Sequence, residues 1–199
     1  MPHEPGKRRQ QILQALASML EGPESEKITT ALLADKLQCS EAALYRHFAS
    51  KAQMFNALID FIESSLFSLI NQIGGRETPG LQQAQEILHV LLAFAEKNRG
   101  MARVLIGEAL VHEKPQLQER VNDLHDKLES AFRQKLRVAT SQQHIAPNND
   151  VNALANLLLC FAIGRWAQYV KSGFQRTPLA QWEAQWTALT AALRHIPAA

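Results

Sequence analysis

Four side chains that can bind a polyanion lie close together in the stretch SEAALYRHFASK, residues 40–51. They are a phenol, a guanidinium, an imidazole and an ammonium: Tyr45, Arg46, His47 and Lys51. Tyr45, His47 and Lys51 could each donate hydrogen bonds to phosphate oxygens. Only Leu44 and Phe48 offer an obvious apolar core there. The stretch fits a surface that docks on nucleic acid or, on a plainer interpretation, a solvated polar helix, and its spacing alone leaves both open.

The elements around this stretch have the spacing of a helix-turn-helix. An amphipathic helix is expected at about 8–20, a second over TTALLADKL, and a third over EAALYRHF after the turn QCS. Thr29 or Thr30 precedes the second helix and Ser40 the third, and these residue types cap helix N-termini. In such a unit the last helix enters the major groove of DNA.

The third helix is predicted to have a core side and a DNA side. Glu41, Leu44 and Phe48 share one face by helical spacing. The opposite face begins with two alanines, which can approach a thymine methyl group closely. A further helix that starts at Lys51 would present backbone N–H groups to a phosphate. The residues predicted to contact DNA are Thr29, Thr30, Ser40, Glu41, Ala42, Ala43, Tyr45, Arg46, His47 and Lys51.

The rest of the chain is also helical by its apolar periodicity. Together with the three short helices we expect about nine, and no strand pattern is present, so the predicted fold class is all-α. We expect a DNA-binding domain at 1–50 and a regulatory and dimerisation body at 51–199. The helices expected in the body lie at about 51–73, 80–97, 99–112, 115–139, 150–172 and from Pro178 to about 195.

Composition and motifs exclude several classes of protein. The formal charge of +2 and the pI of about 8.6 give only weak support for a polyanionic partner. Cys39 and Cys160 form no metal-ligand or disulfide pattern, and we expect two buried thiols. No nucleotide-binding or hydrolase motif is present, so we expect no enzyme, no metal and no cofactor. The longest apolar run, 157–163, is too short to span a bilayer, and we expect a cytoplasmic protein without a membrane partner.

Residues 28–62, and above all the signature LYRHF-x-SK-x-x-MF, resemble the DNA-binding segment of the TetR family. The resemblance implies an all-α homodimer with a three-helix DNA-binding head and a larger helical body. It also implies that Tyr45 and Lys51 contact DNA phosphates. Two positions depart from the pattern, because Cys39 replaces an aliphatic residue and Ala49 replaces the frequent proline.

Two longer stretches, AFAEKNRGMARVLIGEALVHE and GRWAQYVKSGFQRTPLAQWEAQW, resemble the nucleoid occlusion proteins of that family. The resemblance implies binding to specific palindromic sites on the chromosome, by one or more dimers per site, and inhibition of the division protein FtsZ over the nucleoid. The residues it implies for the FtsZ C-terminal tail are Phe61, Ser65, Leu69, Val90, Ala93, Lys97 and Asn98. Lys97 stands where arginine is expected and Leu69 where a basic residue is usual, and a plain core role for Phe61 stays open.

The helix at about 150–172 is apolar on more than one side, which is typical of a helix buried on both sides. It is either a central core helix or half of a two-fold interface with the last helix. We favour the interface, because a protein that binds a palindromic site uses two copies of its DNA-binding domain, one for each half-site. The predicted interface residues are Leu158, Phe161, Trp166, Tyr169 and Trp186. The alternative function is a repressor that responds to a small ligand, although the middle helices offer few polar groups for such a site.

Overall fold

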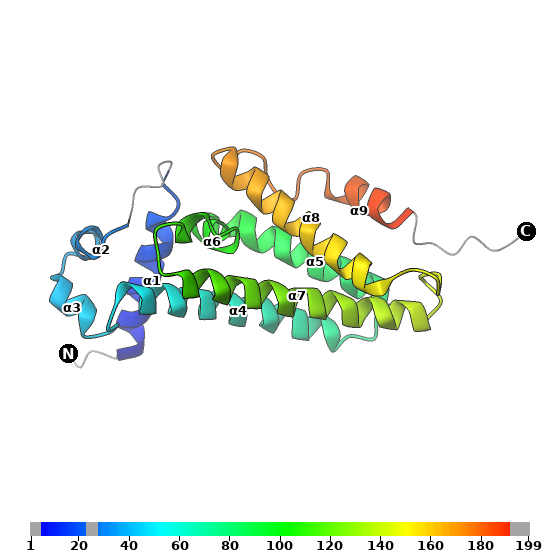
Figure 1. Ribbon diagram of the computed structural model, residues 1–199, viewed down its shortest axis with the longest axis horizontal. Coiled ribbons are helices and arrows are strands. Elements are labelled where there is room, and N and C mark those ends of the chain that lie inside the picture. Colours follow the sequence, from blue (N-terminus) through cyan, green and yellow to red (C-terminus); the bar gives the residue numbers. More distant parts are fainter. Residues whose placement is uncertain (1–4, 23–27, 192–199) are drawn as a thin grey trace, which may run out of the picture. The chain divides into compact units, whose positions relative to one another are not determined.

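The computed structural model describes residues 5–22 and 28–191 (Figure 1). Over these residues the chain forms nine α-helices and no strand, which confirms the all-α fold class. The helices are α1 (Pro5–Met19), α2 (Thr30–Lys36), α3 (Glu41–Tyr45), α4 (Lys51–Gly74), α5 (Gly80–Lys97), α6 (Arg99–Leu105), α7 (Pro115–Ser141), α8 (Val151–Lys171) and α9 (Trp182–Thr190).

Three predicted helices have other bounds in the structure. The helix expected over EAALYRHF ends at Tyr45. The helix expected at 99–112 is broken after α6, because Gly107 takes a left-handed φ of 78° and a 3₁₀ turn, Glu108–Leu110, follows. The last helix begins at Trp182 and not at Pro178, because Gln181 has a φ of 59° and so cannot continue a right-handed helix. Its predicted end near 195 lies outside the described residues.

The described chain forms two compact units, and each is considered by itself. The first comprises the described parts of Met1–Ser64 together with Asn98–Asn122. The second comprises Ser65–Lys97 and the described part of Asp123–Ala199. The division differs from a boundary at residue 50, because the first part of α4, all of α6 and the first part of α7 pack with the N-terminal helices.

Side-chain caps set where the helices of the first unit begin. Thr29 accepts a hydrogen bond from the N–H of Leu32 at 3.2 Å and starts α2. Ser50 starts α4 by accepting one from the N–H of Gln53 at 3.2 Å, and the Gln53 side chain accepts one from the N–H of Ala49 at 2.8 Å. This reciprocal pair resembles a capping box and fixes the turn between α3 and α4.

Close packing in the first unit joins α6 to α1. A Cβ atom added at Gly100 would lie 2.0 Å from the carbonyl oxygen of Ala17, so no other residue fits there without a shift of the backbone. The buried residues Ile12 and Leu16 of α1 belong to the core of this unit. These contacts hold α1 as the support on which the helix-turn-helix rests.

The second unit is built around α5 and α8, which pack side by side (Figure 1). The indole N–H of Trp166 donates to the carbonyl of Leu91 at 3.0 Å, and the hydroxyl of Tyr169 donates to that of Glu96 at 3.1 Å. The guanidinium of Arg165 holds the connection to α9 by donating to three carbonyls, of Thr177, Pro178 and Ala180. Partial burial lowers the pKa of Arg165 below its ordinary value.

The two cysteines are not both buried, which corrects the expectation for them. Cys39 is half-buried at the turn after α2, and Cys160 is exposed on α8. The prediction rested on the tendency of free thiols to be buried, but Cys160 falls on the side of α8 that does not face the core of its own unit.

The helix α8 is long and apolar enough to cross a membrane by length and composition. The length of the longest unbroken apolar run, 157–163, underestimates how apolar the whole helix is. Small and polar residues interrupt the apolar ones but lower the average hydropathy of the helix only slightly. Core helices of soluble proteins meet the same criterion, and α8 has Trp166 and Tyr169 bonded into α5.

Candidate nucleic-acid interface

The helices α2 and α3 form the predicted helix-turn-helix and are held by a small apolar core. Leu33 of α2, Leu44 of α3 and Phe48 beyond it are almost completely buried. Ser40 starts α3 because its hydroxyl accepts a hydrogen bond from the N–H of Ala43 at 3.2 Å. The short α3 therefore has a fixed direction and a fixed rotation about its axis.

The side of α3 away from this core is exposed and carries most of the predicted DNA contacts. Tyr45 has 45% of its surface exposed, and Glu41, Ala42 and Arg46 are also exposed. Ala43 and His47 are half-buried at the margins of this surface. Glu41 was predicted on the core face with Leu44, and the structure corrects this, because the short helix turns Glu41 outward.

A polar network ties the exposed side of α3 to α2. The hydroxyl of Thr30 donates to the carboxylate of Glu41, and the hydroxyl of Tyr45 donates to that of Thr30 at 3.4 Å. The phenol is thus held near the start of α2 at a defined position. The network unites three of the predicted residues, and Arg46, directly after α3, is also exposed.

Sequence reasoning missed one residue that positions α3. Arg9 of α1 donates to the carbonyl of His47 and lies over the ring of Phe48, 4.1 Å from its centroid. A guanidinium is favourable both at the C-terminal end of a helix and on an aromatic face. Three consecutive basic residues, KRR, were visible in the sequence, but no local spacing connects residue 9 with residue 47.

The ammonium of Lys51 was predicted to bind a phosphate and in the structure is paired with a carboxylate. Lys51 begins α4, and its Nζ forms an ion pair with Glu113. The two side chains have 20% and 12% of their surface exposed. Helix starts, where backbone N–H groups suit an anion, lie at three of the predicted residues: Thr29, Ser40 and Lys51.

A hollow with a volume of about 380 Å³ lies in the second unit, between residues of α4, α5 and α9. Leu69 and Val90, two of the residues predicted for the FtsZ tail, line it together with His89 and Trp182. Leu69 has 41% of its surface exposed, and Ala93 and Lys97 lie further along α5, half-buried and exposed respectively. Ser65 is half-buried on α4.

Two further residues predicted for the tail belong to the first unit. Phe61 is an exposed aromatic residue with 45% of its surface accessible, so it is not the core residue that the plainer interpretation expected. Asn98 is half-buried at the residue before α6. Within α4, Phe61, Ser65 and Leu69 recur every four residues and so follow one side of that helix.

The predicted dimer residues divide between the interior and the surface. Trp166 and Tyr169 are fully buried and bonded to α5, and Leu158 and Trp186 are also buried within the chain. Trp166 and Tyr169 have at most 1% of their surface exposed, so they have almost none to bury against a second copy, and this corrects their assignment to an interface. Leu158 and Trp186 keep 4% and 8%, and their assignment stays a prediction. Phe161 alone among the predicted residues is half-buried.

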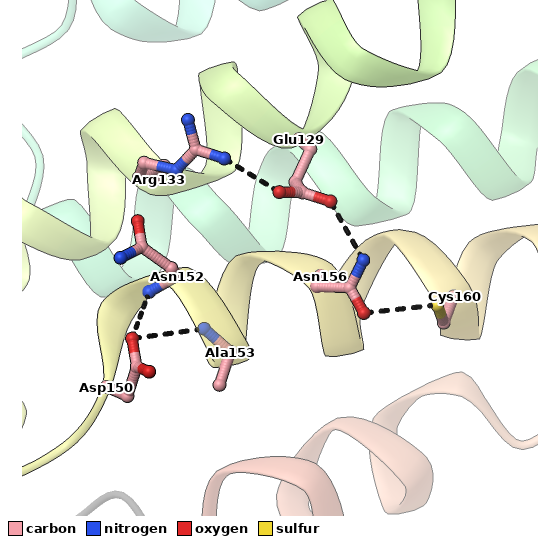
Figure 2. Close-up of polar contacts among 7 residues, drawn as sticks. All are labelled: Glu129, Arg133, Asp150, Asn152, Ala153, Asn156 and Cys160. Atoms are coloured by element: carbon pink, nitrogen blue, oxygen red, sulfur yellow. Dashed lines mark hydrogen bonds and ion pairs between the residues drawn. The ribbon is translucent and has the colours of Figure 1, made fainter. Parts of the chain in front are cut away.

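The exposed side of α8 has a different set of residues, Ala153, Leu157, Cys160 and Gly164, with 46% of Leu157 exposed. Figure 2 shows that Asn156, an exposed polar residue beside them, is bonded, because its amide donates to Glu129 of α7 at 2.9 Å. Glu129 is held in turn by Arg133 at 2.7 Å, and Asp150 caps the start of α8. The four residues named first are themselves small or apolar, so another helix could pack closely against them.

Comparison with known proteins identifies the origin of this arrangement. Residues 12–58 match the bacterial regulatory proteins of the tetR family, and residues 79–194 match the SlmA-like C-terminal domain described as tetracyclin repressor-like. A protein from Alteromonas mediterranea named nucleoid occlusion factor SlmA is 47% identical over 91% of this chain and 93% of its own. The chain belongs to the SlmA family.

A second SlmA protein, from Shewanella baltica, is 49% identical over 90% of this chain and 91% of its own. Solved structures of two TetR regulators have the same fold at low identity. One from Haloarcula marismortui has a TM-score of 0.79 at 16% identity, over 96% of this chain and all of that one. One from Chloroflexus aurantiacus has a TM-score of 0.77 at 17% identity, over 96% and 98%. These SlmA relatives are named as occlusion factors and not as enzymes.

Membership of the SlmA family accounts for the layout of the described residues. The matched tetR segment, 12–58, contains α2, α3 and their caps, and so DNA binding by a dimer is the function of this part of the chain. The separate match to the SlmA-like C-terminal domain covers α5 to α9. The hollow lined by Leu69 and Val90 and the exposed side of α8 lie outside the tetR segment.

Proposed function

We propose that this protein is a nucleoid occlusion factor, a cytoplasmic dimer that binds specific sites on the chromosome and from there inhibits assembly of FtsZ. The observation that carries the proposal is identity close to one half over nine tenths of the chain with proteins of that name. The expected result of the proposal in the cell is a division ring that forms only where nucleoid DNA is absent.

On DNA, α3 would lie in the major groove with its small N-terminal residues against base edges. Ala42 and Ala43 allow the backbone to approach, and Tyr45 and Arg46 reach the flanking phosphates. The hydroxyl groups of Thr29 and Ser40 and the free N–H groups beside them suit further phosphates. Two copies related by a two-fold axis would bind half-sites about one helical turn, or a small multiple, apart.

Lys51→Ala should weaken binding to every duplex by about tenfold, because one phosphate loses its ammonium. The slope of log affinity against log salt should become shallower by about 0.9. Titration of a labelled palindromic duplex and a scrambled duplex at several salt concentrations measures both effects. Lys171→Ala, which removes the same charge at the end of α8, is the matched control and should change neither. Loss of affinity for one sequence alone would show that Lys51 does not bind phosphate.

For FtsZ, the proposed binding surface is the exposed side of α4 and the hollow beside it. The C-terminal tail of FtsZ would place an apolar side chain in the hollow lined by Leu69 and Val90, which is a common mode of peptide recognition. The exposed ammonium of Lys97 would attract an acidic residue of the tail. Retention of FtsZ on an immobilised specific duplex only when this protein is present is the expected result.

The dimer that these functions require is proposed to form through the exposed side of α8. Leu157, Gly164 and their neighbours combine apolar surface with small side chains, which lets two helices approach closely. An apolar helix of this length with an exposed side has a clear use in an oligomer of identical chains. The neighbouring α9 exposes Ala184 and Thr187 and would extend the same surface.

A further inference from the structure

The ion pair between Lys51 and Glu113 lies where the DNA-binding part of the chain meets phosphate. Lys51 is the first residue of α4, directly after the cap residue Ser50. A cation in the first turn of a helix is disfavoured by the helix dipole, since the unpaired N–H groups there already carry positive charge. A nearby anion therefore stabilises the ammonium at this position, and in the structure Glu113 supplies it.

The pair is better protected from water than an ordinary surface ion pair. The side chains have 20% and 12% of their surface exposed, and the ammonium lies 5.6 Å from the ring centroid of Phe55. Partial burial strengthens the attraction between the charges, because fewer water molecules screen it. The backbone of Glu113 is also fixed, since its N–H donates to the carbonyl of Leu110 at 2.9 Å.

A DNA phosphate and the Glu113 carboxylate seek the same ammonium. Two anions on one ammonium repel each other at hydrogen-bond distances, so a phosphate that binds Lys51 must displace or weaken the ion pair. A half-buried carboxylate left without its partner then opposes binding. The effect is independent of base sequence, because only the phosphate backbone is involved.

We propose that Glu113 is a positioning residue that holds Lys51 in the absence of DNA and lowers the affinity of the protein for all duplexes by competing with a phosphate for that ammonium. The inference rests on the proposed DNA-binding function. This competition weakens sequence-independent binding. Contacts between α3 and the bases then determine which DNA sites the protein occupies.

Glu113→Gln should tighten binding to a palindromic duplex and to a scrambled duplex alike, by about three- to tenfold at 0.15 M salt. Lys51→Ala is the background that isolates the mechanism, and there the same substitution should change affinity less than twofold. Glu119→Gln on α7 removes the same charge from an exposed position and should leave affinity within twofold. Glu113→Asp keeps the charge on a shorter side chain, and its duplex affinity should lie between those of wild type and Glu113→Gln.

Each other outcome overturns the inference in a recognisable way. Weaker binding by Glu113→Gln would mean that the ion pair only stabilises the fold, and a lowered melting temperature would accompany it. Equal tightening in the wild-type and Lys51→Ala backgrounds would mean that Glu113 repels DNA directly. Unchanged duplex affinity of Glu113→Gln would mean that the Lys51 ammonium binds the phosphate and the Glu113 carboxylate at the same time, without competition. Failure of the wild-type protein to prefer the palindrome would instead refute the proposed function itself.

Discussion

Leu157→Arg should convert the protein from a dimer into a monomer and lower its affinity for a palindromic duplex by about 100-fold or more. Leu157 has 46% of its surface exposed on α8, so the substitution does not disturb the core of its own chain. In the proposed dimer the new guanidinium would be buried without a partner, at a cost of several kcal/mol. A monomer then binds one half-site and loses the contribution of the second.

The matched control is Gln134→Arg, which adds the same charge at an exposed position of α7. Light scattering should give the dimer mass for wild type and the control, and the monomer mass for Leu157→Arg. Circular dichroism should show equal helix content in all three. A Leu157→Arg protein that remains dimeric would place the two-fold contact on another surface, while a wild-type monomer would refute the dimer altogether.

Phe61→Ala and Lys97→Glu should each abolish binding of the FtsZ tail while duplex affinity stays within about twofold. Both side chains are exposed, so neither substitution should unfold the protein. Removal of an aromatic anchor from a peptide-binding surface commonly costs 2 kcal/mol or more, about thirtyfold in affinity. Reversal of the charge at Lys97 would repel the acidic residue that the wild type attracts.

Val111→Ala is the control for Phe61→Ala, because Val111 is 72% exposed in the first unit and has no assigned role. Arg137→Glu on α7 is the control for Lys97→Glu, since it reverses a charge at another exposed position. Fluorescence anisotropy of a labelled tail peptide measures the affinity. If both variants bind the tail with wild-type affinity, α4 and α5 do not form the tail-binding surface. If duplex binding is lost together with tail binding, the substitution has damaged the fold.

Local patterns in the sequence predicted the helix-turn-helix well. Thr29, Ser40 and Ser50 cap their helices as residues of those types do in general, and such bonds depend only on neighbours along the chain. Of the four residues that apolar spacing predicts for the small core, Leu33 and Leu44 are buried, whereas Leu37 and Cys39 are only half-buried. The family itself was identified from the resemblance to TetR proteins, because the spacing of the helices alone does not distinguish this family from other helix-turn-helix proteins.

Contacts between distant parts of the chain could not be predicted. Lys51 with Glu113 and Arg9 with His47 are separated by 62 and 38 positions, and no sequence period relates them. The assignment of Trp166 to an interface failed for a related reason. An α-helix that is apolar on several sides gives no indication of which side meets its own chain, and the bond from Trp166 to Leu91 decides it.

The most direct test of the account is the effect of the protein on FtsZ polymers in the presence and absence of its DNA site. FtsZ would be assembled with GTP and followed by light scattering and sedimentation, with wild-type protein and either the palindromic or a scrambled duplex. DNA binding by the dimer is expected to favour the state with higher affinity for the tail. Polymers should disassemble with the palindromic duplex and far less with the scrambled one. Unchanged polymers in both mixtures, together with release of the duplex by a small metabolite, would contradict it and establish a ligand-responsive repressor.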